Sequence, residues 1–122
     1  MSTHSKIGYE RLDGKIAAIY CHFDGYPRGV GWILLEQYTT YGEIENLVTK
    51  GAILSLAEDK SKQLFAPEDI TDDAKVYDSR EKYLEDGEEF TYLFTAKGWL
   101  FSDNACSKYA IFQKLTHEII SR

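Results

Sequence analysis

Asp13-Gly14 is the feature of this chain that most constrains its fold, because it stands between two strand-like runs, residues 6–11 and 16–23. Asp-Gly is a preferred central pair of the type I′ turn, which needs positive φ at both positions and joins two antiparallel strands. The sequence therefore predicts a hairpin over 6–23 in which Ile7 faces Tyr20 and Tyr9 faces Ala18. The residues that then share one side of the sheet are Ile7, Tyr9, Ile16, Ala18, Tyr20 and His22, and Ala17, Ile19, Cys21 and Phe23 share the other.

A second hairpin is predicted over 90–102, with strands 90–95 and 99–102 and a turn at 96–98. Its aromatic side chains, among them Tyr92, Phe94 and Trp99, are of the kind that stabilise cross-strand pairs. Lys75-Val76-Tyr77 is predicted as an edge strand. Residues 52–56 fit either a short buried strand or a packed loop, and 57–74 show no regular pattern.

Helices are expected between and after the hairpins. Apolar residues recur at helical spacing from Val30 to Tyr41, and a second helix follows a capping box at Thr40 to Glu43 and ends before Gly51. Ser79 is placed to cap a short acidic helix. Asp103 or Asn104 is expected to cap a C-terminal helix with Phe112, Leu115 and Ile119 on one face.

The element order β-β-α-α-β-α-β-β-α predicts the α+β class. We expect one domain, residues 1–122, with an antiparallel sheet of about four to five strands built from the hairpins 6–23 and 90–102 and with helices packed on one face. The sequence leaves the oligomeric state open, although an aromatic hairpin such as 90–102 could pair edge to edge in a dimer.

The composition argues against a membrane or secreted protein. No apolar run approaches the roughly 18 residues of a membrane-spanning helix, and residues 1–6 lack the apolar core of a signal peptide. Cys21 and Cys106 lie far apart and are expected to be free thiols in a reducing cytoplasm. The expected location is therefore cytoplasmic.

Acidic residues are concentrated in one segment. Residues 68–89 carry ten acids and three bases, a charge of −7, whereas the remainder of the chain carries +1. Such a segment argues against direct nucleic-acid binding and suits a basic protein partner, including one that itself binds DNA or RNA. The alternative is a solvated surface without a partner. The candidate surface consists of Asp72, Asp73, Asp78, Glu81, Glu85, Asp86, Glu88 and Glu89.

The glycine-rich junction at 21–31 is the second candidate site. Helix N-termini offer free N–H groups to phosphates, and this junction precedes a predicted helix. It is not a nucleotide-binding P-loop, because Trp32 and Ile33 follow Gly31 where that motif requires Lys and Ser or Thr. The glycines could equally serve a sharp turn from strand to helix. The candidate ligand-binding residues are His22, Asp24, Tyr26, Arg28, Gly29 and Gly31.

No catalytic constellation is predicted. Cys21 and His22 are adjacent on a strand and point to opposite faces, and Cys106 and His117 would lie about 16 Å apart along the predicted C-terminal helix. His22 and Asp24 could begin a metal site, but no nearby residue completes one. We therefore predict no catalytic residue, no metal and no cofactor.

Residues His22-Phe23-Asp24-Gly25-Tyr26-Pro27 form a His-aromatic-Asp-Gly-Tyr-Pro motif. Through this motif and matching segments elsewhere, most of the chain resembles a group of small proteins of tailed bacteriophages and prophages. The chain departs from the group at Phe23, where Trp or Tyr is usual, and at Trp32, where a polar residue is usual. Matching segments elsewhere are Met1-Ser2-Thr3, Ile7, Glu10, Asp13-Gly14, Ile19-Tyr20-Cys21, Gly29-Val30-Gly31, Leu34-Leu35-Glu36, Tyr38, Leu47-Val48, Gly51, Ile53, Ser55-Leu56, Tyr92-Leu93-Phe94 and Gly98-Trp99.

The resemblance implies a biological context rather than a reaction. Small accessory phage proteins commonly bind and disable a host protein, so we expect a non-enzymatic protein that modulates a bacterial protein in the host cytoplasm. An inhibitor of a host defence system, of the anti-CRISPR kind, fits this expectation. The first alternative is a small phosphate-binding, nucleotide-binding or enzymatic domain that uses the 22–31 junction, and the second is a virion or assembly component.

Overall fold

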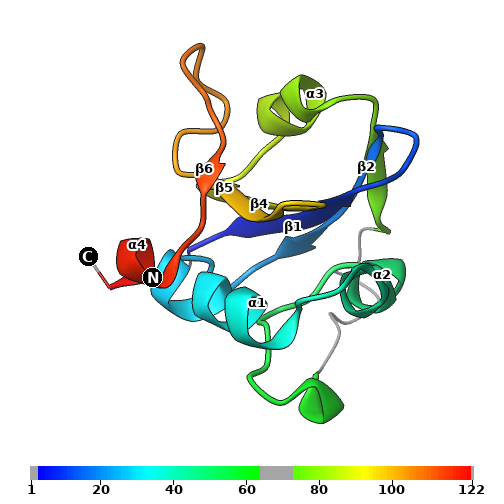
Figure 1. The fold of residues 1–122 in the computed structure, drawn as a ribbon, viewed down its shortest axis with the longest axis vertical. Coiled ribbons are helices and arrows are strands. Elements are labelled where there is room, and N and C mark those ends of the chain that lie inside the picture. Colours follow the sequence, from blue (N-terminus) through cyan, green and yellow to red (C-terminus); the bar gives the residue numbers. More distant parts are fainter. Residues whose placement is uncertain (1–2, 64–72, 122) are drawn as a thin grey trace.

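The computed structural model describes residues 3–63 and 73–121, which form six strands and four α-helices (Figure 1). The predicted α+β class is confirmed. The strands are β1 (Ser5–Glu10), β2 (Ile16–Cys21), β3 (Lys75–Tyr77), β4 (Phe90–Thr95), β5 (Gly98–Ser102) and β6 (Gln113–Lys114). The helices are α1 (Trp32–Gln37), α2 (Tyr41–Thr49), α3 (Arg80–Glu85) and α4 (His117–Ile120), with a π-helical turn η1 (Pro27–Gly31) and a 3₁₀ turn η2 (Lys60–Lys62).

The sheet has the order β3-β2-β1-β4-β5-β6. Both predicted hairpins are present, and β3 lies at one edge as predicted. The sheet is mixed rather than antiparallel, because β1 and β4 are paired in parallel at its centre. A parallel pair needs a long crossover connection, and the helical segments between the two hairpins provide it.

The predicted register of the first hairpin is wrong by one residue. Ile7 pairs with Ile19 and Tyr9 pairs with Ala17. The turn has three residues, with Gly14 N–H donating to Arg11 O (3.0 Å) and only Gly14 (φ +84°) in the left-handed region. Such a loop, a type I turn followed by a left-handed glycine, uses Asp-Gly differently from a type I′ turn. Because side chains alternate along a strand, the slip moves all of β2 to the opposite face.

Each face of the sheet has its own apolar cluster. On one side, the main core packs Ile7, Ile19 and Cys21 against α1 and α2. On the other, a small core contains Ile16, Ala18, Tyr83 and Leu93. Figure 1 shows α1 and α2 below the sheet and α3 above it, so the prediction of helices on one face is corrected to helices on both.

The predicted caps of α2 and α3 are confirmed. Thr40 Oγ1 accepts from Glu43 N–H (3.3 Å) at the start of α2, and Ser79 Oγ accepts from Lys82 N–H (3.1 Å) at the start of α3. Gly51 follows α2 with φ +87°. The helical run from residue 30 is interrupted before α2, at 38–40. The longest helix of the described ranges, α2, has nine residues, and no helix there can cross a membrane.

The predicted C-terminal helix from Asp103 or Asn104 is wrong. Residues 103–112 form a loop, β6 follows, and α4 begins only after Thr116, whose Oγ1 accepts from Ile119 N–H (3.2 Å). Phe112 packs on the small core and Leu115 lies in the main core, on the other side of the sheet. A three-residue spacing suits one face of a helix, but in extended chain it alternates between faces.

Candidate functional site

The junction after β2 uses its polar backbone groups within the fold. Asp24 has φ +58°, and its carbonyl accepts from Val30 N–H (3.1 Å), while Tyr26 O accepts from Gly29 N–H (2.9 Å). A Cβ on Gly29 would lie 2.5 Å from Asp24 O, so this close approach requires glycine. Gly31 is buried against Tyr92. Two of the N–H groups that could hold a phosphate are therefore already bonded.

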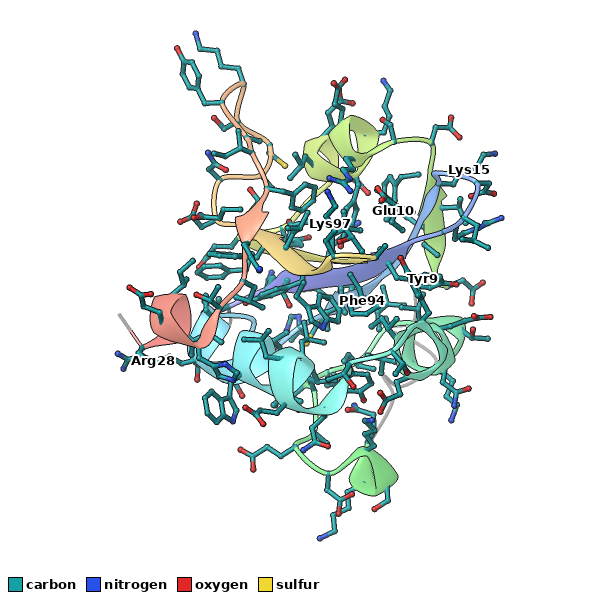
Figure 2. All side chains as sticks on the ribbon, viewed as in Figure 1. Tyr9, Glu10, Lys15, Arg28, Phe94 and Lys97 are labelled. Atoms are coloured by element: carbon teal, nitrogen blue, oxygen red, sulfur yellow. The ribbon has the colours of Figure 1, made fainter. Side chains whose placement is uncertain are left out.

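Arg28 reaches the C-terminus of the chain rather than the junction. Its Nε donates to Ile120 O (3.2 Å) and its Nη2 to Ser121 O (3.4 Å), at the end of α4. Figure 2 shows Arg28 beside α4. Carbonyls at a helix C-terminus lack intrahelical donors and carry partial negative charge. Arg28 thus fixes α4 against η1.

His22 belongs to a different group of side chains. Its ring stacks on His4, with centroids 4.7 Å apart, and its Nδ1 lies 2.8 Å from the Tyr20 hydroxyl. Asp24 accepts a hydrogen bond from the exposed Tyr26 hydroxyl (3.3 Å). The structure therefore separates the predicted ligand residues into a His22 group, an Asp24–Tyr26 pair and the structural positions of Arg28, Gly29 and Gly31.

The acids of the predicted acidic surface differ in their surroundings. Asp72 lies outside the described residues. Asp78 is 3.8 Å from Lys15 with its side chain 85% exposed, and Glu85 is 3.5 Å from Lys82. Residues without an ion-pair partner among the described ranges are Asp73, Glu81 and Glu89, all exposed, and the half-buried Glu88.

Asp86 stands apart because it organises a network on the α3 side of the sheet. It accepts from Lys6 Nζ (2.9 Å) and from the Tyr77 hydroxyl (2.5 Å), and Lys75 Nζ lies 3.7 Å away. These hydrogen bonds and charges lower the pKa of Asp86 to about 2. Burial and the neighbouring carboxylate raise the pKa of Tyr77 well above its usual value. Lys6, whose side chain is only 10% exposed, also lies over the Tyr77 ring.

A pocket of about 320 Å³ adjoins this network. It brings three acids of the acidic segment next to residues of β1, β2 and β3. Sequence reasoning missed Lys6, Tyr20 and Lys75 at this site; the correct hairpin register, which pairs Lys6 with Tyr20, would have revealed the first two. The charged and aromatic lining residues are Lys6, Tyr20, Asp73, Lys75, Asp86 and Glu88.

The two thiols and His117 lie in three different places. Cys21 is fully buried in the main core, and burial raises the pKa of its thiol to about 11. Cys106 has φ +68° and its Sγ lies 3.3 Å from Glu85 O, beside the end of α3. His117 Nε2 lies 2.7 Å from a Glu36 carboxylate oxygen, on α1.

Within residues 3–63 and 73–121, no group of three or more His, Cys, Asp or Glu side chains is close enough to hold a metal ion. Comparisons of the chain with protein-family models, with curated proteins and with solved structures found no match.

Proposed function

We propose that this protein is a non-enzymatic accessory protein of a phage or prophage that binds a bacterial protein and inhibits a host defence system. The resemblance around His22-Phe23-Asp24-Gly25-Tyr26-Pro27 supports the phage context. The binding surface is the acidic face, defined as the exposed acids of α3 and its flanks: Asp78, Glu81, Glu85 and Glu89.

The observation that carries the proposal is the gathering of exposed acids on one short helix and its flanks, two of which, Glu81 and Glu89, have no ion-pair partner among the described residues. Glu81 and Glu85 are four residues apart on α3, so their like charges are neighbours on the helix surface and oppose helix formation by a few tenths of a kcal/mol. Glu85 also lies in the last turn, where the helix dipole disfavours negative charge. A partner with a basic surface would compensate the repulsion between Glu81 and Glu85 and pair the carboxylates that the fold leaves unpaired.

The charge of the acidic face selects the kind of partner. Proteins that bind DNA or RNA carry basic surfaces that neutralise phosphates, and clustered carboxylates can occupy the same surface. We therefore expect the partner to be a nucleic-acid-binding protein of a bacterial defence system. Binding of this chain should displace nucleic acid from it.

The test is affinity capture from bacteria that express the full chain, followed by binding measurements with the purified partner. The variant E81K/E85K should weaken binding at least tenfold, and raising the salt concentration from about 0.1 to 0.5 M should weaken wild-type binding, because exposed charges are screened. When the wild-type chain is added to a complex of the partner with DNA or RNA, the nucleic acid should be released.

E36K/E58K is the matched control, since it makes the same change in net charge at exposed acids outside the acidic face. Equal weakening by both double variants would mean that only net charge matters, and no weakening by either would exclude the acidic face. Failure of the wild-type chain to displace nucleic acid from any captured protein would exclude the proposed mode of inhibition.

A further inference from the structure

A second surface lies between the tip of the first hairpin and the first turn of α2. It is a groove of about 480 Å³. We call it the aromatic groove and define it by Tyr9, Leu12, Tyr41 and Glu45, with Glu10, Arg11 and Asp13 around the hairpin tip. Tyr9 and Phe94 are register neighbours on β1 and β4, and Figure 2 shows both at the side of the sheet that faces α2.

Two of the large side chains of the aromatic groove, Leu12 and Tyr41, are exposed. Leu12 is 106% exposed, at a turn position that accepts most residue types. Tyr41 is 38% exposed and packs edge-on against Phe94, with ring centroids 5.0 Å apart. An apolar pocket bordered by exposed apolar residues is typical of an interaction site.

The charges around the aromatic groove leave one carboxylate available. Asp13 is paired with Arg11 (2.8 Å), and Glu10 makes two hydrogen bonds with Arg80 (2.6 and 2.9 Å). Glu45, exposed on α2, has no ion-pair partner among the described residues. Its charge is nevertheless close enough to Tyr9 to raise the pKa of that phenol further than burial does alone. The groove therefore offers aromatic surface next to an uncompensated negative charge.

We infer that the aromatic groove binds a segment of the partner protein in which an aromatic side chain stands next to a lysine or arginine. The aromatic ring would pack against Tyr9, Leu12 and Tyr41, and the basic residue would pair with Glu45. Aromatic anchors in apolar pockets commonly dominate protein–protein binding, with charges at the rim adding specificity. This inference rests on the proposed function, since it assigns a second contact to the same partner.

A second copy of this chain is a poorer occupant. In a two-fold symmetric contact the same patch meets itself, so the two Glu45 carboxylates would face a lining whose one base, Arg11, is already paired with Asp13. Like charges placed together across an interface disfavour association. Charge complementarity therefore favours a basic segment from a different protein.

The inference can be tested without the partner by NMR titration of the full chain with short blocked peptides. Acetyl-Phe-Arg-amide should shift the amide signals of Leu12, Tyr41 and Glu45 in a saturable way, and acetyl-Phe-Glu-amide should bind more weakly by about fivefold or more. E45Q should weaken binding of the Phe-Arg peptide about 1.5- to 5-fold, the range expected for an exposed ion pair.

E58Q is the control, because it removes an exposed carboxylate elsewhere and should leave the titration unchanged. L12S should weaken the binding of both Phe peptides without changing the fold, since the Leu12 side chain is fully exposed in the free chain. Equal binding of the two peptides, shifts confined to other residues, or a dimer in sedimentation analysis that L12S dissociates would each overturn the inference.

The outcome is separable from that of the proposed function. Suppose that the captured partner binds E81K/E85K more weakly than the wild-type chain but binds L12S and E45Q as tightly. This result would support the acidic face and exclude the groove. If the chain binds the Phe-Arg peptide saturably but captures no partner, the groove would stand as a binding site and the proposed function would be excluded.

Discussion

Asp86 shows how one acid of a charged segment can stabilise the fold while its neighbours do not. Its carboxylate is shared by Lys6, Lys75 and Tyr77, whereas Glu81 and Glu89 have no ion-pair partner in the described ranges. The Lys6 side chain is largely withdrawn from solvent, so removal of Asp86 would leave its charge poorly compensated.

D86N should therefore lower the free energy of unfolding at pH 7 by about 1 kcal/mol, a modest value because the Asp86 side chain is half exposed. The pKa of Asp86 is lowered from 3.8 to about 2. Its contribution is thus fully present above about pH 4 and is lost as the pH falls toward 2. Urea titrations of both proteins should show the difference shrinking over that interval. D73N, at an unpaired acid, should show almost no difference, and a difference for D86N that stays constant down to pH 2 would contradict this account.

Gly29 and Gly42 make a matched pair for testing the junction. A Cβ at Gly29 would lie 2.5 Å from Asp24 O, whereas a Cβ at Gly42, in the first turn of α2, would have no heavy atom within 4 Å. G29A should lower the free energy of unfolding by about 1–3 kcal/mol, the usual cost of overpacking. G42A should raise it by up to about 1 kcal/mol, because alanine favours the helix. Chemical denaturation measures both, and the same sign for the two variants would refute the assigned close approach at Gly29.

At the scale of elements, the junction and α4 depend on each other. η1 follows directly from the loop at Asp24, and Arg28 within η1 holds the last carbonyls of α4. A four-residue helix has little stability of its own. Its order comes from the Thr116 cap at one end, Arg28 at the other and the burial of Ile120 in the main core.

R28A should accordingly loosen α4 and leave the sheet intact. We expect faster hydrogen exchange at the Ile120 and Ser121 amides, which bond to Thr116 O and His117 O, and unchanged exchange in β1. T116A, which removes the opposite cap, should produce the same local change. Unaltered exchange in R28A, together with loss of a phosphate-induced rise in melting temperature, would instead identify Arg28 as an anion ligand.

For the molecule as a whole, the two thiols report different events. Cys106 is exposed, whereas Cys21 is fully buried in the main core with a pKa of about 11. Because the thiolate is the reactive form, Cys106 should react rapidly with a disulfide reagent in the native protein, and Cys21 should react only on unfolding. In C106S the fast phase should disappear, and the rate at Cys21 should follow the equilibrium population of unfolded protein as urea is added. Fast labelling of C106S in native buffer would contradict the packing of the main core.

Local patterns in the sequence predicted the elements that local interactions stabilise. The caps at Thr40 and Ser79, the left-handed Gly51 and both hairpins were predictable because their causes lie within a few residues. The register of the first hairpin was not predictable, since Asp13-Gly14 fits two turn types whose strand pairings differ by one residue. The C-terminal pattern was ambiguous because Phe112 and Leu115 serve opposite faces of the sheet, a distinction that depends on partners far away in the chain.

The features of the candidate sites likewise divide into those that the sequence determined and those that only the tertiary structure decided. The sequence alone determined the α+β class, the acidic segment and the glycine-rich turn, because composition and short-range spacing specify them. Only the tertiary structure decided that β1 and β4 run parallel, that Arg28 binds α4, and that Asp86 joins Lys6 across 80 positions of the chain. The physical reason is that strand register and long-range pairing depend on which side chains can be buried together, and a one-residue shift exchanges the two faces of a strand.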